Sequence, residues 1–337
     1  MATLSSKMLP AGVATLAQGA LADTSVQPND SPAFDGLTVN GNAYPSDGAL
    51  SNRNIIINPF MAVAQRDNRA PAAYTVPFYA GPDRWLVARS GTGTTGFSRI
   101  ANTDFGGTYA AQATFESAAT ESWNVQQRIE SANVAHLAGQ EVTLSFYVSG
   151  SSSAGSSTMF AALNYANVID NFSADTEIAN FSVAYTGTAT KFTFTFTLPA
   201  QATNGVSVVL RGVKTDATGT FTLTFGGVQL ETGNTATPFE HRSIGTELAF
   251  CQRYYVKQTR EILMSARALS PPNSGAGVVL FWPTQMRAAP GVVETGSAAL
   301  SSLSVGGITV GGCWFAAAAT SAVTTAALSG YTADAEL

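Results

Sequence analysis

Polar and apolar residues alternate along several stretches of the chain. The clearest is Lys191–Leu198, where the apolar side chains occupy the even positions and threonines occupy the odd positions between them. A period of two is the pattern of a β-strand with one buried face. Further strands are predicted at residues 141–148, 160–165, 206–212 and 221–231. No run with helical spacing separates them, so this part of the chain is predicted to be an all-β sandwich.

The stretch Trp123–Glu130 alternates in the same way and has one distinctly polar face. One side carries Trp123, Val125, Gln127 and Ile129, and the other carries Asn124, Gln126, Arg128 and Glu130. We predict that Trp123 belongs to the core. The polar side is open to two interpretations: a ligand-binding face, or a solvated face on which Arg128 and Glu130 pair.

Residues 225–255 are predicted to end one β-domain and to form a helix that contacts a second domain. Phe225, Val228 and Leu230 are the expected inward side chains of a strand broken at Gly226-Gly227. After a turn ending at Pro238, four residues fall at i, i+4, i+7 and i+11, which predicts a short helix with one apolar stripe. These four are Ile244, Leu248, Cys251 and Tyr255. Ser243 is placed to cap this helix, and Gly245 weakens its first turn.

The helix separates two regions of β pattern. Beyond it, strands are predicted at residues 278–282, 291–294, 304–310 and 322–328. Before residue 54 there is little periodicity, apart from a short hairpin expected at residues 37–43, while Ile55–Ile57 suits a buried strand. We therefore divide the chain into an N-terminal arm (1–53), a β-sandwich (54–242), a junction helix (243–255) and a C-terminal β-tip (256–337).

Composition narrows the functional classes. Only 12% of the 337 residues are charged, against 45% hydrophobic, which favours extended β-structure with extensive subunit contact. The net charge is −5 without a basic cluster, so no nucleic-acid partner is expected. The two cysteines, Cys251 and Cys313, are expected to be buried thiols. No membrane-spanning segment is predicted, and the N-terminal residues make a poor signal peptide.

Two phrases around the helix carry a family resemblance. They are VQLE-x-G-x-x-ATPFE at residues 228–240 and GTEL-x-x-CQRYY at residues 245–255. Together they resemble the domain junction of bacteriophage tail-fibre and virion-fibre proteins. Four more phrases recur in that family: ALADT-x-x-QP at residues 20–28, N-x-x-IN…QR at residues 54–66, Asp83-Arg84-Trp85, and the final ADAEL at residues 333–337. The resemblance implies a virion protein whose N-terminal arm attaches to another virion protein.

The order of strands resembles a second group, the jelly-roll carbohydrate-binding modules. The matching features are Trp123 with Gln126, a turn ending at Gly139, and the strand Thr143–Phe146. This resemblance implies a jelly-roll sandwich in which Asn124, Gln126 and Arg128 line the glycan-binding sheet. Such modules can hold calcium, but no dense Asp cluster marks a loop for it, and we expect no metal site and no cofactor.

The sequence offers little for catalysis. Its 22 acidic residues are scattered, its only histidines are His136 and His241, and it lacks the phosphate-loop, zinc-protease and nucleophile-elbow motifs. We therefore expect no enzyme and no catalytic residue. The favoured hypothesis is a homotrimeric receptor-binding fibre on the virion surface that adheres to host surface glycan. The alternatives are a purely structural head or tail fibre or decoration protein, and a glycan depolymerase.

Overall fold

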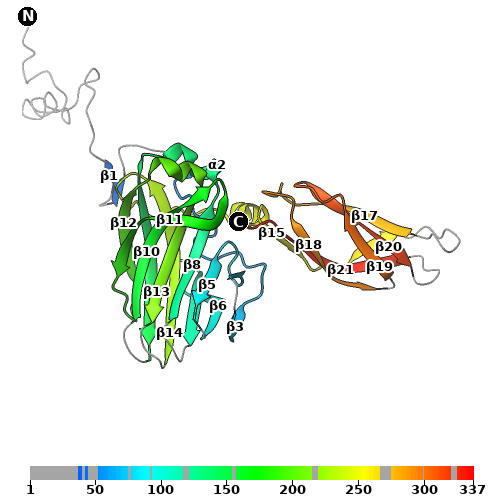
Figure 1. The fold of residues 1–337 in the computed structure, drawn as a ribbon, viewed down its shortest axis with the longest axis horizontal. Helices are drawn as coiled ribbons and strands as arrows, with labels where there is room; N and C mark the ends of the chain where they lie inside the picture. Colours follow the sequence, from blue (N-terminus) through cyan, green and yellow to red (C-terminus); the bar gives the residue numbers. More distant parts are fainter. Residues whose placement is uncertain are drawn as a thin grey trace, which may run out of the picture.

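The computed structural model describes residues 37–39, 42–44, 52–74, 77–91, 93–116, 121–153, 157–214, 219–265, 275–298, 300–319 and 325–337. These residues form a large β-sandwich and a smaller β-domain, joined at a short helix with the C-terminus beside the junction (Figure 1). The fold is all-β, as predicted. Most of the predicted arm lies outside the described residues. Its hairpin is confirmed, with β1 (Leu37–Val39) antiparallel to β2 (Asn42–Tyr44).

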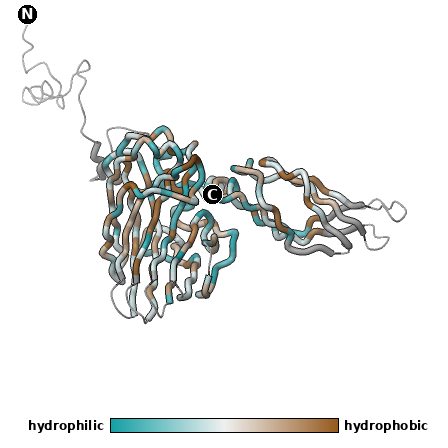
Figure 2. Tube along the Cα trace, in the orientation of Figure 1, coloured by the Kyte–Doolittle hydropathy of each residue, from teal (hydrophilic) through white to brown (hydrophobic). Residues whose placement is uncertain are grey.

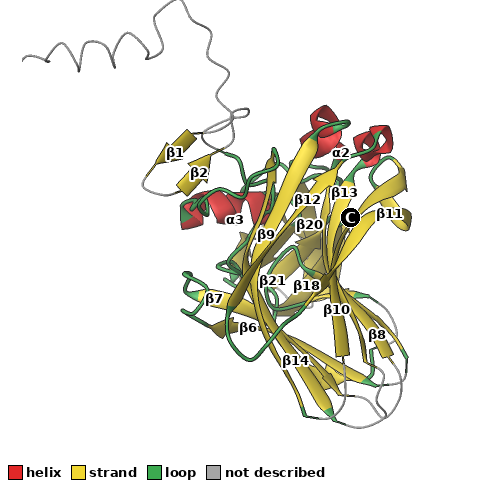
Figure 3. Cartoon of the chain, turned by 90° about the vertical axis from the view of Figure 1, so that its left-hand side faces the viewer, coloured by secondary structure: helices red, strands yellow, loops and turns green. Residues whose placement is uncertain are grey.

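The sandwich consists of two antiparallel sheets, each of six strands within the described residues. The first sheet runs in the order β11 (Asn171–Val183), β10 (Ser157–Val168), β13 (Val206–Lys214), β8 (Glu121–Ile129), β5 (Leu86–Ser90) and β4 (Phe78–Tyr79). The second runs β12 (Thr190–Thr197), β9 (Glu141–Ser152), β14 (Thr220–Thr232), β7 (Tyr109–Glu116), β6 (Thr94–Ala101) and β3 (Arg69–Ala72). Short helices lie near one end of the strands (Figure 3): α2 (Ser131–Val134), η2 (Ala135–Leu137) and η3 (Ala200–Asn204).

The core between the two sheets follows the predicted alternation, which is visible as alternating hydropathy along the strands (Figure 2). Trp123 and Trp85 are both buried in this core, as expected. The Trp123 ring stacks on Phe115 at a centroid distance of 4.5 Å and on Phe221 at 5.5 Å. Gly212, opposite Trp123 on β13, leaves room for the indole, because a Cβ there would lie 2.3 Å from it.

The strand break predicted at the glycine pair is confirmed. The register of β14 against β9 shifts between Gly226 and Gln229, and Gly227 has a φ of +60° that favours glycine. Phe225, Val228 and Leu230 all point into the core on either side of this bulge. The bulge therefore resets the alternation without exposing an apolar side chain.

The smaller domain contains two further sheets. One pairs β15 (Tyr255–Gln258), β16 (Ile262–Ser265) and β18 (Gly291–Ala298) with the central β21 (Thr325–Asp334). The other has the order β17 (Gly275–Phe281), β20 (Gly312–Ala319) and β19 (Leu300–Gly306). Trp282, Phe315 and Tyr331 form the centre of its core, and Cys313 is buried among them. Both cysteines are buried free thiols, as predicted.

Two local predictions are corrected. Ile55–Ile57 is not a strand but an irregular extended segment, in which only the central Ile56 is fully buried. The junction helix α3 covers Ile244–Gln252, and Tyr255 begins strand β15 rather than extending the helix. Ser243 does cap it, with its hydroxyl oxygen accepting from the main-chain nitrogen of Thr246. Among the described residues, no helix is long and apolar enough to cross a membrane.

Candidate functional site

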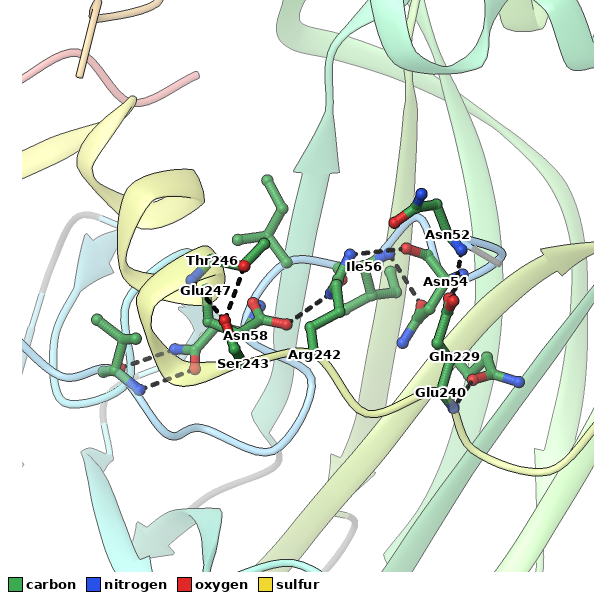
Figure 4. A network of polar contacts seen from close by, with 12 residues as sticks. Asn52, Asn54, Ile56, Asn58, Gln229, Glu240, Arg242, Ser243, Thr246 and Glu247 are labelled. Atoms are coloured by element: carbon green, nitrogen blue, oxygen red, sulfur yellow. Dashed lines mark hydrogen bonds and ion pairs between the residues drawn. The ribbon is translucent and has the colours of Figure 1, made fainter. Parts of the chain in front are cut away.

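The extended segment at residues 52–58 is held mainly by side chains (Figure 4), with one main-chain bond from Ile55 to Leu230 of β14. The main-chain nitrogen of Asn54 donates to a carboxylate oxygen of Glu240 at 2.9 Å. Arg242 donates to the main-chain oxygen of Asn54 at 3.0 Å and also to that of Ile56. Polar side chains thus replace the ladder that a sheet would provide, and they satisfy backbone groups that burial would otherwise leave unpaired.

Glu247 explains why only half of the predicted helix stripe is correct: Cys251 and Tyr255 are buried, but Ile244 and Leu248 are not. This buried carboxylate accepts from the main-chain nitrogen of Asn58 at 2.8 Å, and it also binds the guanidinium of Arg242. Its anchoring turns α3 so that Glu247 and Cys251 face inward, while Ile244 and Leu248 are 60% and 37% exposed. A charged side chain with fixed partners therefore overrides the apolar stripe in setting the helix orientation.

The turn before the helix is fixed by a second cluster of buried polar groups. Glu231 accepts from the main-chain nitrogen of Thr237 at 2.9 Å and from the amide of Gln229 at 2.8 Å. Gln229 in turn accepts from the main-chain nitrogen of Glu240 at 2.9 Å. The conformation of this turn thus depends on the same Glu and Thr residues that form the VQLE…ATPFE phrase.

A buried ion network joins the two domains. Arg84 and Glu336 form an ion pair in which both side chains are almost fully buried. The Arg84 guanidinium also stacks on the ring of Tyr254 at 3.4 Å and donates to the main-chain oxygen of Arg128 at 2.6 Å. Burial is the largest single effect on the pKa of Arg84 and would lower it, but the Glu336 carboxylate, together with Tyr254, Tyr79 and Cys251, raises the pKa above its ordinary value. For Tyr254, burial acts in the opposite direction and raises the pKa to about 12, although the cationic Arg84 opposes this.

Further contacts bind the smaller domain to the sandwich. Arg66 stacks on the ring of Tyr255 at 3.6 Å and reaches Glu336 at 3.3 Å. Glu130 accepts from Arg253 at 2.8 Å and lies 3.4 Å from Arg287. Glu130 therefore does not pair with Arg128. The main-chain nitrogen of Ala335 also donates to the main-chain oxygen of Tyr254, just after α3, at 2.8 Å.

All of the family phrases in the described residues meet at this junction. The segment at residues 54–66, the Asp83-Arg84-Trp85 turn, the two phrases around α3 and the final residues 333–337 contribute the contacts above. Most of their polar groups are engaged with one another and with the main chain. The phrases that carry the resemblance therefore coincide with the contacts that join the two β-domains.

The polar side of β8 carries the residues that the sequence predicts to bind a ligand. Asn124, Gln126 and Arg128 share the outer face of the first sheet, opposite the core-facing Trp123 and Ile129, as predicted. Gln126 is only 7% exposed, which corrects the expectation that this face is freely solvated. Arg128 is not free either, because its guanidinium donates to the main-chain oxygen of Leu337 and lies 5.5 Å from the ring of Phe172.

The register extends this outer face over neighbouring strands. Ser207 on β13 lies opposite Arg128, and Asn164 on β10 lies opposite Ser207. A second row runs from Asn124 through Arg211 to Phe160. Between these rows lie side chains that are buried without belonging to the core: Leu86, Gln126, Val209 and Ala162.

Several polar atoms on this face have no hydrogen-bond partner among the residues that the structure describes. They include Oδ1 of Asn164, Oγ of Ser207 and Oδ1 of Asn124, all of which are buried. Arg211 borders the second row, where it pairs with Glu177 at 2.7 Å and its side chain stays 40% exposed. Sequence reasoning missed Asn164, Ser207 and Arg211. The same period of two in residues 157–168 and 206–214 would have placed them on the outer face, but only the register aligns them with β8.

Comparisons with known proteins give a likeness of fold. No protein-family model matches the chain, and no curated protein matches it. One similar structure is the enzymatically active domain of tailspike protein 4 of bacteriophage CBA120, with 13% identity and a TM-score of 0.36 over 56% of this chain. That match spans only 24% of the tailspike chain.

Two other similar structures are small sugar-binding proteins matched over their whole length. The module TmCBM61, in complex with β-1,4-galactotriose, has 12% identity and a TM-score of 0.33 over 54% of this chain. A putative sugar binding protein from Bacteroides thetaiotaomicron has 12% identity and a TM-score of 0.36, also over 54%. At such identities and scores, these matches do not indicate what the present chain binds.

Proposed function

We propose that this chain is a non-catalytic adhesion protein of a bacteriophage virion, which binds host surface glycan through the outer face of the first sheet of its sandwich. The observation that carries the proposal is the set of buried oxygens without protein partners on Asn124, Asn164 and Ser207. A buried polar atom left unpaired costs about 1–3 kcal/mol. Three such atoms on one face of a sheet are best explained by a ligand or water that supplies their hydrogen bonds.

Saccharide chemistry suits these groups. Amide and hydroxyl oxygens accept hydrogen bonds from sugar hydroxyls, and an aromatic ring offers a surface to the apolar face of a pyranose. Phe160 provides such a ring, and Arg211 lies 5.7 Å from it. Long side chains border the unpaired oxygens, so a ligand would reach them when Arg211 shifts from its pair with Glu177.

The absence of catalysis is part of the proposal. Hydrolysis by paired carboxylates needs two acidic groups that flank one bond. On β10, β13, β8 and β5 the described rows of the outer face contain no carboxylate. On β11, Glu177 lies directly opposite Asn164 and is ion-paired with Arg211, so one carboxylate, not two, borders the rows. This arrangement favours binding over cleavage.

The proposal of a virion protein rests on the junction phrases. We propose that copies of this chain associate through the smaller domain. Val279 and Phe281 on β17 and Trp314 on β20 form one exposed apolar strip, in which Val279 lies directly opposite Trp314 and Phe281 is 80% exposed. Exposed apolar patches of this kind mark association surfaces. We place the homotrimer interface here, with the N-terminal arm attached to another virion protein. Sedimentation of Phe281→Ser should show smaller species than the parent chain, and a parent that is monomeric at micromolar concentration contradicts this assignment.

The test of function is binding of the full chain to host polysaccharide, combined with an assay for released reducing ends. Specific binding without release supports adhesion. Release of reducing ends would replace it with depolymerase activity. If the chain binds no host glycan, the proposal is wrong and the alternative of a purely structural fibre or decoration protein takes its place. The contact of Arg128 with Leu337 on this same face would then be a structural contact.

A further inference from the structure

A cavity lies at the junction end of the sandwich and shares no residue with the rows of the outer sheet face. Its volume is about 720 Å³, within the range of about 300–1,000 Å³ expected for small-molecule sites. Three segments enclose it: the extended segment from Asn52 to Ile57, the helical turn from Asn133 to Gln140, and the end of α3 with Tyr254.

One wall of the cavity is rigid before any ligand arrives. Along the extended segment, Arg53, Ile55 and Ile57 line the cavity. The main chain of Ile57 is fixed on both sides by the amide of Gln127, which accepts from its nitrogen and donates to its oxygen, each at 2.8 Å. The nitrogen of Ile55 donates to the main-chain oxygen of Leu230 at 3.0 Å. A wall held in this way loses little freedom on binding.

The charge of the lining has one sign. Three arginines and a histidine line the cavity, and no carboxylate does. Arg242 is engaged by Glu247, whereas Arg253 contacts Glu130 through Nη2 at 2.8 Å and keeps a side chain that is 38% exposed. Arg53 donates from Nη2 to the main-chain oxygen of Pro238 at 3.3 Å, so its position is fixed at the rim. Arginine guanidinium groups match carboxylate and phosphate geometry.

The remaining lining suits a sugar ring. Ile55, Ile57 and the half-exposed ring of Phe250 are apolar, while Asn133 and Gln140 bring amides that can both donate and accept. We propose that this cavity binds an acidic saccharide, whose carboxylate or phosphate meets Arg53 and Arg253 and whose ring lies against the apolar wall. The site is separate from the outer sheet face, so the proposed function and this proposal can fail independently.

Calorimetry on the full chain tests the proposal with four probes: trigalacturonate, glucose 6-phosphate, the neutral galactotriose and a triglutamate peptide. At least one acidic sugar should bind at least tenfold more tightly than galactotriose and triglutamate, and more weakly at high salt. Preference for trigalacturonate or for glucose 6-phosphate identifies the acidic group. If galactotriose binds equally well, the acidic group of the ligand does not matter and the proposal is wrong. If triglutamate binds equally well, the cavity recognises negative charge without a sugar ring, and the proposal is again wrong. Absence of binding by either acidic sugar also overturns the proposal.

Variants locate the site. Arg53→Gln should weaken the acidic sugar about tenfold, and Phe250→Ala should weaken it several-fold without touching an ion pair. Arg260→Gln removes an exposed arginine outside the cavity and should change nothing. Asn164→Ala with Ser207→Ala should also leave this binding unchanged. If both cavity variants keep the parent thermal midpoint and the parent affinity, the acidic sugar does not bind here and the proposal is wrong.

Discussion

The junction between the domains and the outer face of the first sheet differ in how their polar groups are satisfied. At the junction, the charged side chains of Arg84, Glu336 and Glu247 have close partners on other segments of the chain, although single atoms such as Nε of Arg84 make no hydrogen bond. On the sheet face, Asn164 and Ser207 keep buried oxygens without partners. The phrases that resemble the fibre proteins all belong to the first region, whereas only Gln126, from the carbohydrate-module resemblance, lies in the second. The fibre-like phrases therefore report how the two domains are joined, and the residues of the proposed glycan face, apart from Gln126, belong to no recognisable phrase.

The largest effect should come from opening the junction. Glu336→Ala leaves Arg84 buried without its carboxylate, and loss of one member of a buried pair costs about 3–5 kcal/mol. We expect the free energy of unfolding measured by denaturant titration to fall by that amount. Asp334→Asn is the matched control, because this carboxylate is 47% exposed and exposed pairs contribute about 0–1 kcal/mol. Equal losses in the two variants would mean that the buried network does not hold the domains together.

A pH dependence should follow from the same network. Burial raises the pKa of Tyr254 to about 12 from an ordinary value of 10.0, so the unfolded chain loses this proton at a lower pH than the folded protein does. The contribution of this group is intact below pH 10 and is lost as the pH rises through 12, which amounts to about 2–3 kcal/mol for two pKa units. Tyr254→Phe should flatten the alkaline limb of the stability curve. If the stability of this variant falls at alkaline pH as steeply as that of the parent chain, a group other than Tyr254 causes the pH dependence.

The sheet face should respond in the opposite direction. Ser207→Ala removes a buried hydroxyl without a partner, so stability should stay level or rise by up to about 1 kcal/mol. If glycan binds here, its affinity should fall about tenfold, which equals roughly 1.4 kcal/mol. Thr143→Ala is a matched control, since its hydroxyl donates to the main-chain oxygen of Gly233 at 2.6 Å. It should lower stability and leave glycan affinity unchanged. A Ser207→Ala protein that is destabilised and binds normally would show that the hydroxyl has a structural role.

Sequence alone was enough for the all-β class and for several strands, and for these it gave the buried side. It did not predict β6, β7, β11 or β20, and its strand at residues 304–310 runs past the end of β19 at Gly306. The alternation in Lys191–Leu198 and Trp123–Glu130 reflects burial of one face, which is local information. It could not give strand register, so it could not align Asn164 and Ser207 with Arg128 across three strands. Nor could it show that Leu337, more than 200 positions later, lies over the face that Gln126 and Arg128 were expected to keep open.

The smallest effect should be at Leu248, on the junction helix. Its place in the apolar stripe predicts burial between the domains, and truncation of a fully buried leucine costs about 2–5 kcal/mol. In the structure α3 instead buries Glu247 and leaves Leu248 37% exposed. Leu248→Ala should therefore change the free energy of unfolding by less than about 1 kcal/mol. Glu247→Gln, one residue away, should cost clearly more, because it removes the carboxylate that holds Asn58 and Arg242. If instead the leucine variant loses more stability than the glutamate variant in the same titration, the helix is oriented by its stripe and the ionic anchor is secondary.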